Sequence, residues 1–261
     1  RPPISTLFPY TTLFRSPAYD EKDEVSDLWL VPGDGSAPPR RFTTAKSKES
    51  SPAWSPDSRQ IAFTAKRDGD DAAQIYVIAI DGGEARRLTQ LALGARAPLW
   101  SPDGQSIAFQ APMHRDATND ADNKRIADER KQAKSKVRAY DGFPVRRWDK
   151  WLEDVQTRLF VMPADGTSAP RDLLGGTALL QLPGYRGAFG EGAGEDLQPA
   201  WTPDSRSLVF TATTNLDAAA YAEVLYQLYE VAVAGGEPWP LTGGDLSHQR
   251  ATFSPDRKSV V

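Results

Sequence analysis

The chain has 261 residues, a net charge of −4 and 39% apolar residues. The weak negative charge excludes the global basic field that favours nucleic acid, and no apolar run is long enough to span a membrane. The absence of cysteine excludes disulfides and cysteine metal sites, but it leaves a periplasmic or a cytoplasmic location open.

The first 16 residues, RPPISTLFPYTTLFRS, share nothing with the rest of the chain. A widely used short-read sequencing adapter translates to the same peptide except at Ile4, which one base change explains. The last residues, 256–261 (DRKSVV), match the translation of its reverse complement up to a stop codon. We therefore expect adapter-derived artefacts at 1–16 and 256–261, with Asp256 ambiguous, and an incomplete protein over 17–255.

A first motif recurs inside 17–255. Residues 52–65 read PAWSPDSRQIAFTA, 98–111 read PLWSPDGQSIAFQA and 199–212 read PAWTPDSRSLVFTA, and another copy begins at 251–255. In each copy a strand ends in an aromatic residue and an apolar strand follows. The Pro-Asp-Gly/Ser sequence between them forms a tight turn, because the fixed φ of proline suits its second position. Each copy predicts a β-hairpin.

A second motif alternates with the first at about 27–43, 74–89, 158–173 and 226–242, and it also reads strand, glycine turn, strand. Two hairpins make four antiparallel strands, and Trp54 lies 46 residues before Trp100. This period is typical of a β-propeller blade, a four-stranded antiparallel sheet. The fold class is therefore all-β, a partial propeller of about four blades. We expect the end of one blade at about 19–45, blades at 50–90, 97–175 and 198–243, and the first strand of another at 250–255.

The blade at 97–175 is long because it contains an insertion at about 113–157. The insertion opens with a charged, helix-favouring stretch over 117–133 and continues with an aromatic and charged stretch over 137–154. We expect a helical or irregular excursion from the rim of the blade. The segment 176–197 is rich in glycine and is predicted to be a mobile loop.

The aromatic and basic end of this insertion is the best functional candidate. Its members are proposed to contact a substrate or a partner domain: Arg146, Arg147, Trp148, Trp151, Glu153 and Asp154. One interpretation is a helix that packs Trp148, Trp151 and Leu152 on its own blade at i, i+3, i+4 spacing. The other is a rim element that faces a partner domain or a peptide, with Glu153 or Asp154 available to bind an amine.

No catalytic motif accompanies these residues. The two histidines, His114 and His248, do not form a pair at metal or triad spacing, and each is expected at the surface. No Gly-x-Ser-x-Gly elbow, phosphate loop, Rossmann fingerprint or zinc motif occurs, so the sequence predicts no catalytic residue, no metal and no cofactor. The recurrent aspartate of Ser-Pro-Asp is interpreted as a turn former rather than as a carboxylate array.

The blade motifs resemble two propeller families, the periplasmic Tol-system propeller protein and the N-terminal propeller of prolyl oligopeptidase-type serine peptidases. Residues 140–151 (YDGFPVRRWDKW), followed by 158–161 (RLFV), look like bacterial dipeptidyl- and acylaminoacyl-peptidase propellers. Tol-type repeats are more uniform and lack this segment, so the insertion favours the peptidases.

The peptidase resemblance implies a parent protein that cleaves short peptides. A C-terminal α/β-hydrolase domain, missing from this chain, is expected to supply the Ser-Asp-His triad, and the propeller to restrict access to it. No residue here matches a catalytic motif of that family, so the chain by itself is expected to be inert. The alternatives are a Tol-type propeller that binds proteins and a propeller attached to a different hydrolase.

Overall fold

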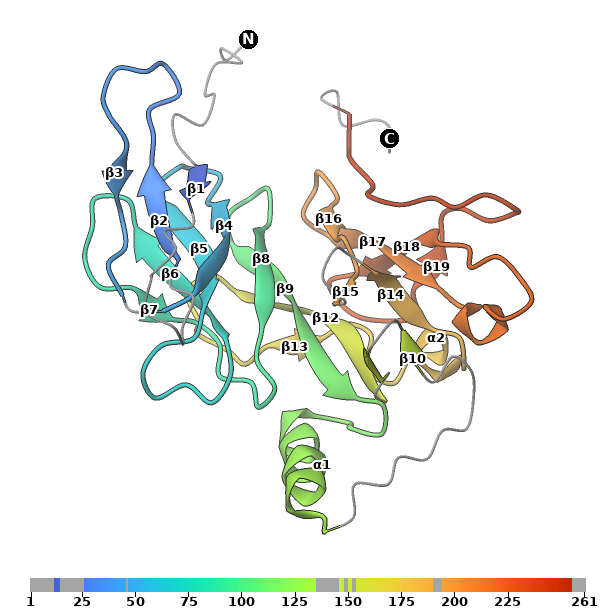
Figure 1. Ribbon diagram of the computed structural model, residues 1–261. Coiled ribbons are helices and arrows are strands. Elements are labelled where there is room, and N and C mark those ends of the chain that lie inside the picture. Colours follow the sequence, from blue (N-terminus) through green and yellow to red (C-terminus); the bar gives the residue numbers. More distant parts are fainter. Residues whose placement is uncertain are drawn as a thin grey trace. The chain divides into compact units, whose positions relative to one another are not determined.

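The computed structural model describes residues 12–14, 26–45, 47–134, 146–147, 150–151, 154–189 and 194–254. The chain divides into two compact units, Arg1–Trp100 and Ser101–Val261. Antiparallel strands dominate the described part of both units (Figure 1). The predicted all-β fold, built from four-stranded antiparallel sheets, is confirmed.

Among the described residues, two sheets lie entirely within the first unit. One has the order β1-β2-β3, from Thr12–Phe14, Asp27–Leu30 and Arg40–Arg41. The other has the order β4-β5-β6-β7, from Glu49–Trp54, Gln60–Ala65, Gln74–Ala79 and Arg86–Arg87. The second sheet is the four-stranded blade predicted at 50–90. Strand β1 lies in the segment 1–16 that the sequence attributes to adapter, and it pairs with β2.

Alternating apolar side chains of these strands form the core of the first unit. Leu28 and Leu30 of β2 are buried with Ile61 and Phe63 of β5. The ring of Phe63 stacks on that of Tyr76, with 6.0 Å between centroids. Burial on both faces explains why β5 and β6 are almost continuously apolar.

The next sheet is the 97–175 blade and has the order β13-β12-β9-β8. Its strands are β8 (Arg96–Trp100), β9 (Ser106–His114), β12 (Val155–Pro163) and β13 (Arg171–Asp172). The ladder between β9 and β12 runs from the Ser106–Pro163 pair to the His114–Val155 pair. The long excursion therefore leaves and re-enters the sheet at one end, over residues 115–154.

The 198–243 blade contains β16 (Ala200–Trp201), β17 (Ser207–Thr213), β18 (Gln227–Ala232) and β19 (Trp239–Pro240). Two further strands, β14 (Arg186–Phe189) and β15 (Glu195–Asp196), extend the same sheet beyond β17. A short helix α2 (Ala178–Gln181) precedes them, and the 3-10 helix η1 (Leu216–Ala218) follows β17.

The prediction that 176–197 is a loop is wrong for the part that the structure describes. This segment, which we call the strap, folds as α2, β14 and β15, and Tyr185 within it is fully buried. The apolar residues between the glycines supply the buried surface that orders it. Glycine content alone did not reveal these contacts.

The Ser-Pro-Asp turns confirm the role assigned to their aspartates. The Asp103 carboxylate accepts a hydrogen bond from the Ser101 hydroxyl at 2.6 Å and another from the Gln105 N–H at 3.0 Å. Asp57 and Asp204 make the same pair of contacts in their own turns. These carboxylates are turn formers.

Candidate functional site

The excursion between β9 and β12 begins with a helix. Helix α1 spans Asp120–Gln132, which confirms the helical stretch predicted at 117–133. The Asn119 side chain caps it by accepting a hydrogen bond from the Asp122 N–H at 2.9 Å. Asp120 and Asp122 lie in the first turn and Arg130 and Lys131 in the last, an arrangement that complements the helix dipole.

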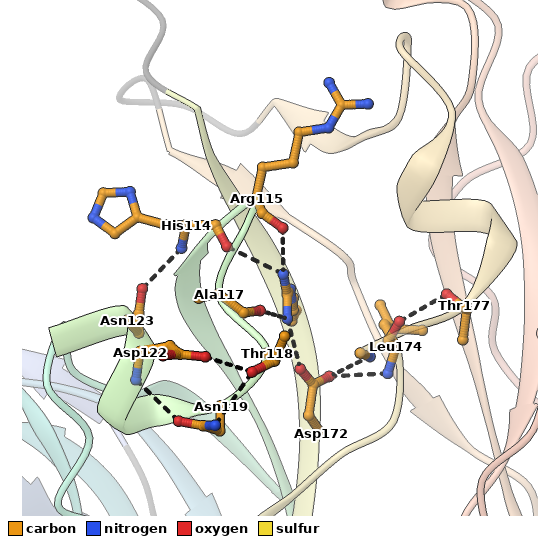
Figure 2. Close-up of polar contacts among 12 residues, drawn as sticks. His114, Arg115, Ala117, Thr118, Asn119, Asp122, Asn123, Asp172, Leu174 and Thr177 are labelled. Carbon is orange, nitrogen blue, oxygen red and sulfur yellow. Dashed lines mark hydrogen bonds and ion pairs between the residues drawn. The ribbon is translucent and has the colours of Figure 1, made fainter. Parts of the chain in front are cut away.

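The buried side chain of Asn123 docks α1 on the blade. Asn123 is fully buried, and its Oδ1 accepts a hydrogen bond from the His114 N–H at 2.8 Å. Its Nδ2 donates to the Pro112 carbonyl at 3.1 Å. Figure 2 shows Asn123 of the helix facing the backbone of His114 at the end of β9. A single amide thus joins the helix to the strand from which the excursion departs.

A buried guanidinium lies where the excursion leaves β9. Arg158 is the fourth residue of β12, and its side chain is only 3% exposed. It donates hydrogen bonds to three backbone carbonyls where the excursion begins, those of His114 at 3.1 Å, Arg115 at 3.2 Å and Ala117 at 3.0 Å (Figure 2). A buried cation requires such acceptors, because an unpaired charge in the interior is very costly.

Asp172 of β13 supplies the counter-charge to this guanidinium. Its Oδ2 lies 3.1 Å from Nη1 of Arg158. Its Oδ1 accepts hydrogen bonds from the N–H groups of Leu174 and Gly175, both at 2.9 Å. One carboxylate therefore ties Arg158 to the turn that follows β13.

A second ion pair connects the two ends of the described excursion. Arg130 in the last turn of α1 binds both carboxylate oxygens of Asp154, the residue before β12. Burial alone would raise the pKa of Asp154, but hydrogen bonding and charge from Arg130, with a smaller contribution from His114, hold that pKa below its usual value. Nδ1 of His114 lies 3.5 Å from the same carboxylate.

The structure corrects two expectations about these residues. His114 is buried rather than at the surface, because β9 continues to this position and α1 and Asp154 cover it. The helical interpretation of 148–152 is wrong at Trp151, which lies in β11 (Lys150–Trp151) paired with β10 (Arg146–Arg147). Spacing over so few residues does not separate a helix from a hairpin. Trp148 and Glu153 lie outside the described residues.

The polar groups around Arg158 and Asp154 are suited to holding the backbone in place rather than to catalysis. The Arg158 and Asp154 charges are engaged by protein groups, as described above. Across the residues that the structure describes, no group of three His, Cys, Asp or Glu side chains could hold a metal ion. In the same part of the chain, no helix is long and apolar enough to cross a membrane.

Sequence reasoning missed Arg158, Asp172 and Asn123. The signal was a break in the second motif. Two other copies place Gln74 and Gln227 at the position of Arg158, one residue before an apolar residue in the middle strand, and the copy at 27–43 places Asp27 there. Residues 171–174 also read RDLL, where 86–89 read RRLT and 239–242 read WPLT. Aligning the copies residue by residue would have shown a cation at position 158 and a leucine at position 174, where the other three copies have threonine.

Residues 19–142 match the family described as the Tricorn protease N-terminal β-propeller domain. The chain carries a β-propeller related to the N-terminal propellers of peptidases. The Bacillus subtilis (strain 168) protein YuxL, named an uncharacterized peptidase, is 40% identical over 83 residues, which are 31% of this chain and 12% of that protein. This match supports the resemblance to prolyl oligopeptidase-type propellers that the sequence motifs indicate.

Two other likenesses place the propeller in a wider group. The Tol-Pal system protein TolB of Bordetella pertussis is 37% identical over 61 residues, 23% of this chain and 14% of that protein. The acylaminoacyl peptidase of Pyrococcus horikoshii shares the fold, with a TM-score of 0.56 and 14% identity over 93% of this chain and 31% of that one. The chain spans less than a third of the length of each of these relatives.

Proposed function

We propose that this chain is the non-catalytic propeller of a serine peptidase that cleaves short peptides, and that it gates access to an α/β-hydrolase domain. The observation that carries the proposal is the 40% identity to a peptidase over 83 residues. The match to a peptidase propeller family over 19–142 supports it. No residue of the chain is assigned a catalytic role.

The end of the blades that carries the excursion is the part that we assign to the hydrolase domain or the peptide. The excursion departs from this end of β9, and the strap strand β14 pairs with the corresponding end of β17. Within the excursion, the proposed contacts are Arg146, Arg147, Trp148, Trp151 and Glu153. Asp154 is a weaker candidate for binding an amine, because Arg130 already occupies its carboxylate.

The decisive experiment is to extend the reading frame past residue 254 in the source DNA. We expect it to continue into an α/β-hydrolase domain with a Gly-x-Ser-x-Gly elbow. The longer protein should then react with a fluorophosphonate probe and turn over dipeptidyl or acyl-aminoacyl reporter substrates, and alanine at the elbow serine should abolish both. A stop codon within two or three blades, without an elbow, would refute the peptidase assignment.

The second candidate function is a Tol-type periplasmic propeller that acts as a protein-binding module. The 37% identity to TolB over 61 residues favours it. It predicts a reading frame that ends soon after the propeller closes, and a purified protein that binds a partner but leaves every peptidase reporter intact. The same DNA extension therefore separates the two functions.

A further inference from the structure

The blades that precede and follow the 97–175 blade in the sequence each contain a glutamine–threonine pair. In the 50–90 blade, the Thr89 hydroxyl accepts a hydrogen bond from the Ile75 N–H at 2.9 Å and donates to Gln74 Oε1 at 2.8 Å. Gln74 Nε2 then donates to the Leu91 carbonyl at 2.8 Å. Both side chains are buried, so the pair joins the beginning of β6 to the segment that follows β7.

The 198–243 blade repeats this geometry. The Thr242 hydroxyl accepts from the Leu228 N–H at 2.9 Å and donates to Gln227 Oε1 at 2.7 Å. Gln227 Nε2 donates to the Leu246 carbonyl at 2.9 Å. The glutamine–threonine pair therefore occurs in two blades. The copy at 27–43 keeps the threonine, because Thr43 accepts a hydrogen bond from the Leu28 N–H at 2.9 Å, but it has Asp27 in place of the glutamine.

The blade between them has lost both members of the pair. The register Tyr76↔Arg87 in one blade corresponds to Phe160↔Asp172 in the other. By that register, Leu174 occupies the position of Thr89, and Arg158 that of Gln74. Leu174 is fully buried and offers no hydroxyl. Arg158 instead extends to the carbonyls of residues 114, 115 and 117, outside its own pair of strands.

We propose that Arg158 is a positioning residue. It stands where the neighbouring blades have the glutamine of the pair, and it holds the start of the excursion, residues 115–134, on the blade. The guanidinium has five N–H donors and can bind three carbonyls of a departing chain, whereas a glutamine amide has only two N–H donors. Asp172 neutralises the charge that this exchange introduces. The proposal rests on these contacts and not on the peptidase assignment.

The test introduces the glutamine–threonine pair into the 97–175 blade. The double variant R158Q/L174T rebuilds the glutamine–threonine pair of the flanking blades and removes the guanidinium. In hydrogen–deuterium exchange on the full chain, we expect amides of 115–134 to exchange at least about tenfold faster than in the wild type, because charge-assisted buried hydrogen bonds are lost. Amides of β12 should stay within about twofold of wild type, because the rebuilt pair fastens that strand.

Two further variants make the result specific. R171Q removes the guanidinium of Arg171, the residue before Asp172. Arg171 is exposed, and it donates to the carbonyls of Val233 and Ala234 rather than to the excursion. This variant should leave exchange in 115–134 unchanged, as should L174T alone, which retains Arg158. Wild-type protection of 115–134 in the double variant would overturn the proposal. So would equal acceleration throughout the blade, or failure of the double variant to fold, since either would make Arg158 a general support of the sheet.

Discussion

Gly184 allows a sharp test of how the strap packs on the loop after β17. The backbone of Gly184 lies against that loop, and its carbonyl accepts a hydrogen bond from the Leu216 N–H at 3.1 Å. A Cβ placed on Gly184 would clash with Asp217 Oδ1 and would lie 2.5 Å from the Thr214 carbonyl oxygen and 2.8 Å from the Leu216 nitrogen. Two of these three atoms are backbone atoms and cannot rotate away.

The magnitude follows from these contacts. The φ angle of Gly184 is outside the left-handed region, so the cost of Gly184→Ala is steric. Inserting a methyl group into a packed site costs about 1–3 kcal/mol. Separating the two segments also removes one backbone hydrogen bond, worth about 1 kcal/mol. We expect Gly184→Ala to lower the free energy of unfolding by about 2–4 kcal/mol.

The assay is urea unfolding followed by tryptophan fluorescence, with Gly194→Ala as the matched control. Gly194 belongs to the same strap, but a Cβ there would meet nothing within 4 Å. The control should keep the wild-type midpoint or raise it slightly, because alanine restricts the unfolded chain. Adding Asp217→Ala to Gly184→Ala should recover only part of the loss, since the Thr214 and Leu216 backbone contacts remain. Equal midpoints for the two glycine variants would refute this packing.

Three other substitutions test separate parts of the molecule. Ser58 has φ 58° at the turn position where the 97–175 blade has Gly104. Ser58→Gly should therefore raise the free energy of unfolding, and Gly104→Ser should lower it, each by about 0.5–1 kcal/mol in the urea assay. Shifts of the same sign would contradict this. Burial raises the pKa of Glu49, although hydrogen bonds to its carboxylate oppose the shift, so the folded state loses stability as the pH rises above the ordinary glutamate value. Glu49→Gln should therefore gain stability relative to wild type as the pH rises above the ordinary glutamate pKa, and a pH-independent difference would count against the reasoning. Phe109 is fully buried and stacks on Phe160 at 5.6 Å, so Phe109→Ala should cost about 3–5 kcal/mol in the same urea assay, and a loss below about 1 kcal/mol would be inconsistent with that packing.

The repeated hairpins were predictable because their determinants are local. Pro102 presets the φ angle of the turn, Asp103 bonds to the hydroxyl and N–H groups beside it, and Gly104 adopts φ 73° at little cost. These contacts lie within a few residues of one another in sequence. A single copy of the motif is therefore enough to predict the turn, and the recurrence of copies is enough to predict the blade.

The strap and Arg158 were not predictable in this way, because their partners are distant in sequence. Strand β14 exists because Gly187 pairs with Ala212, and a glycine-rich segment gives no local indication of that register. Arg158 reads as an ordinary charged residue near the end of a strand until its partners, more than 40 residues away at His114 and Ala117, are known. Buried polar networks require the tertiary structure, since their stability depends on satisfying every group.

In the second unit, the two ends of the sheets differ in a way that separates scaffold from function. At one end, the Ser-Pro-Asp turn before β9 and the Thr-Pro-Asp turn before β17 keep the same hydrogen bonds. At the other end, β9 is followed by the excursion, whereas β17 pairs with β14 and is followed by η1. Turns that only connect strands have little reason to diverge within a repeat, whereas segments that contact a substrate or a partner domain do. The departures from the repeat therefore lie at the end of the blades that is proposed to contact a substrate or a partner domain, and Arg158 and Gly184 lie where those segments pack on the rest of the unit.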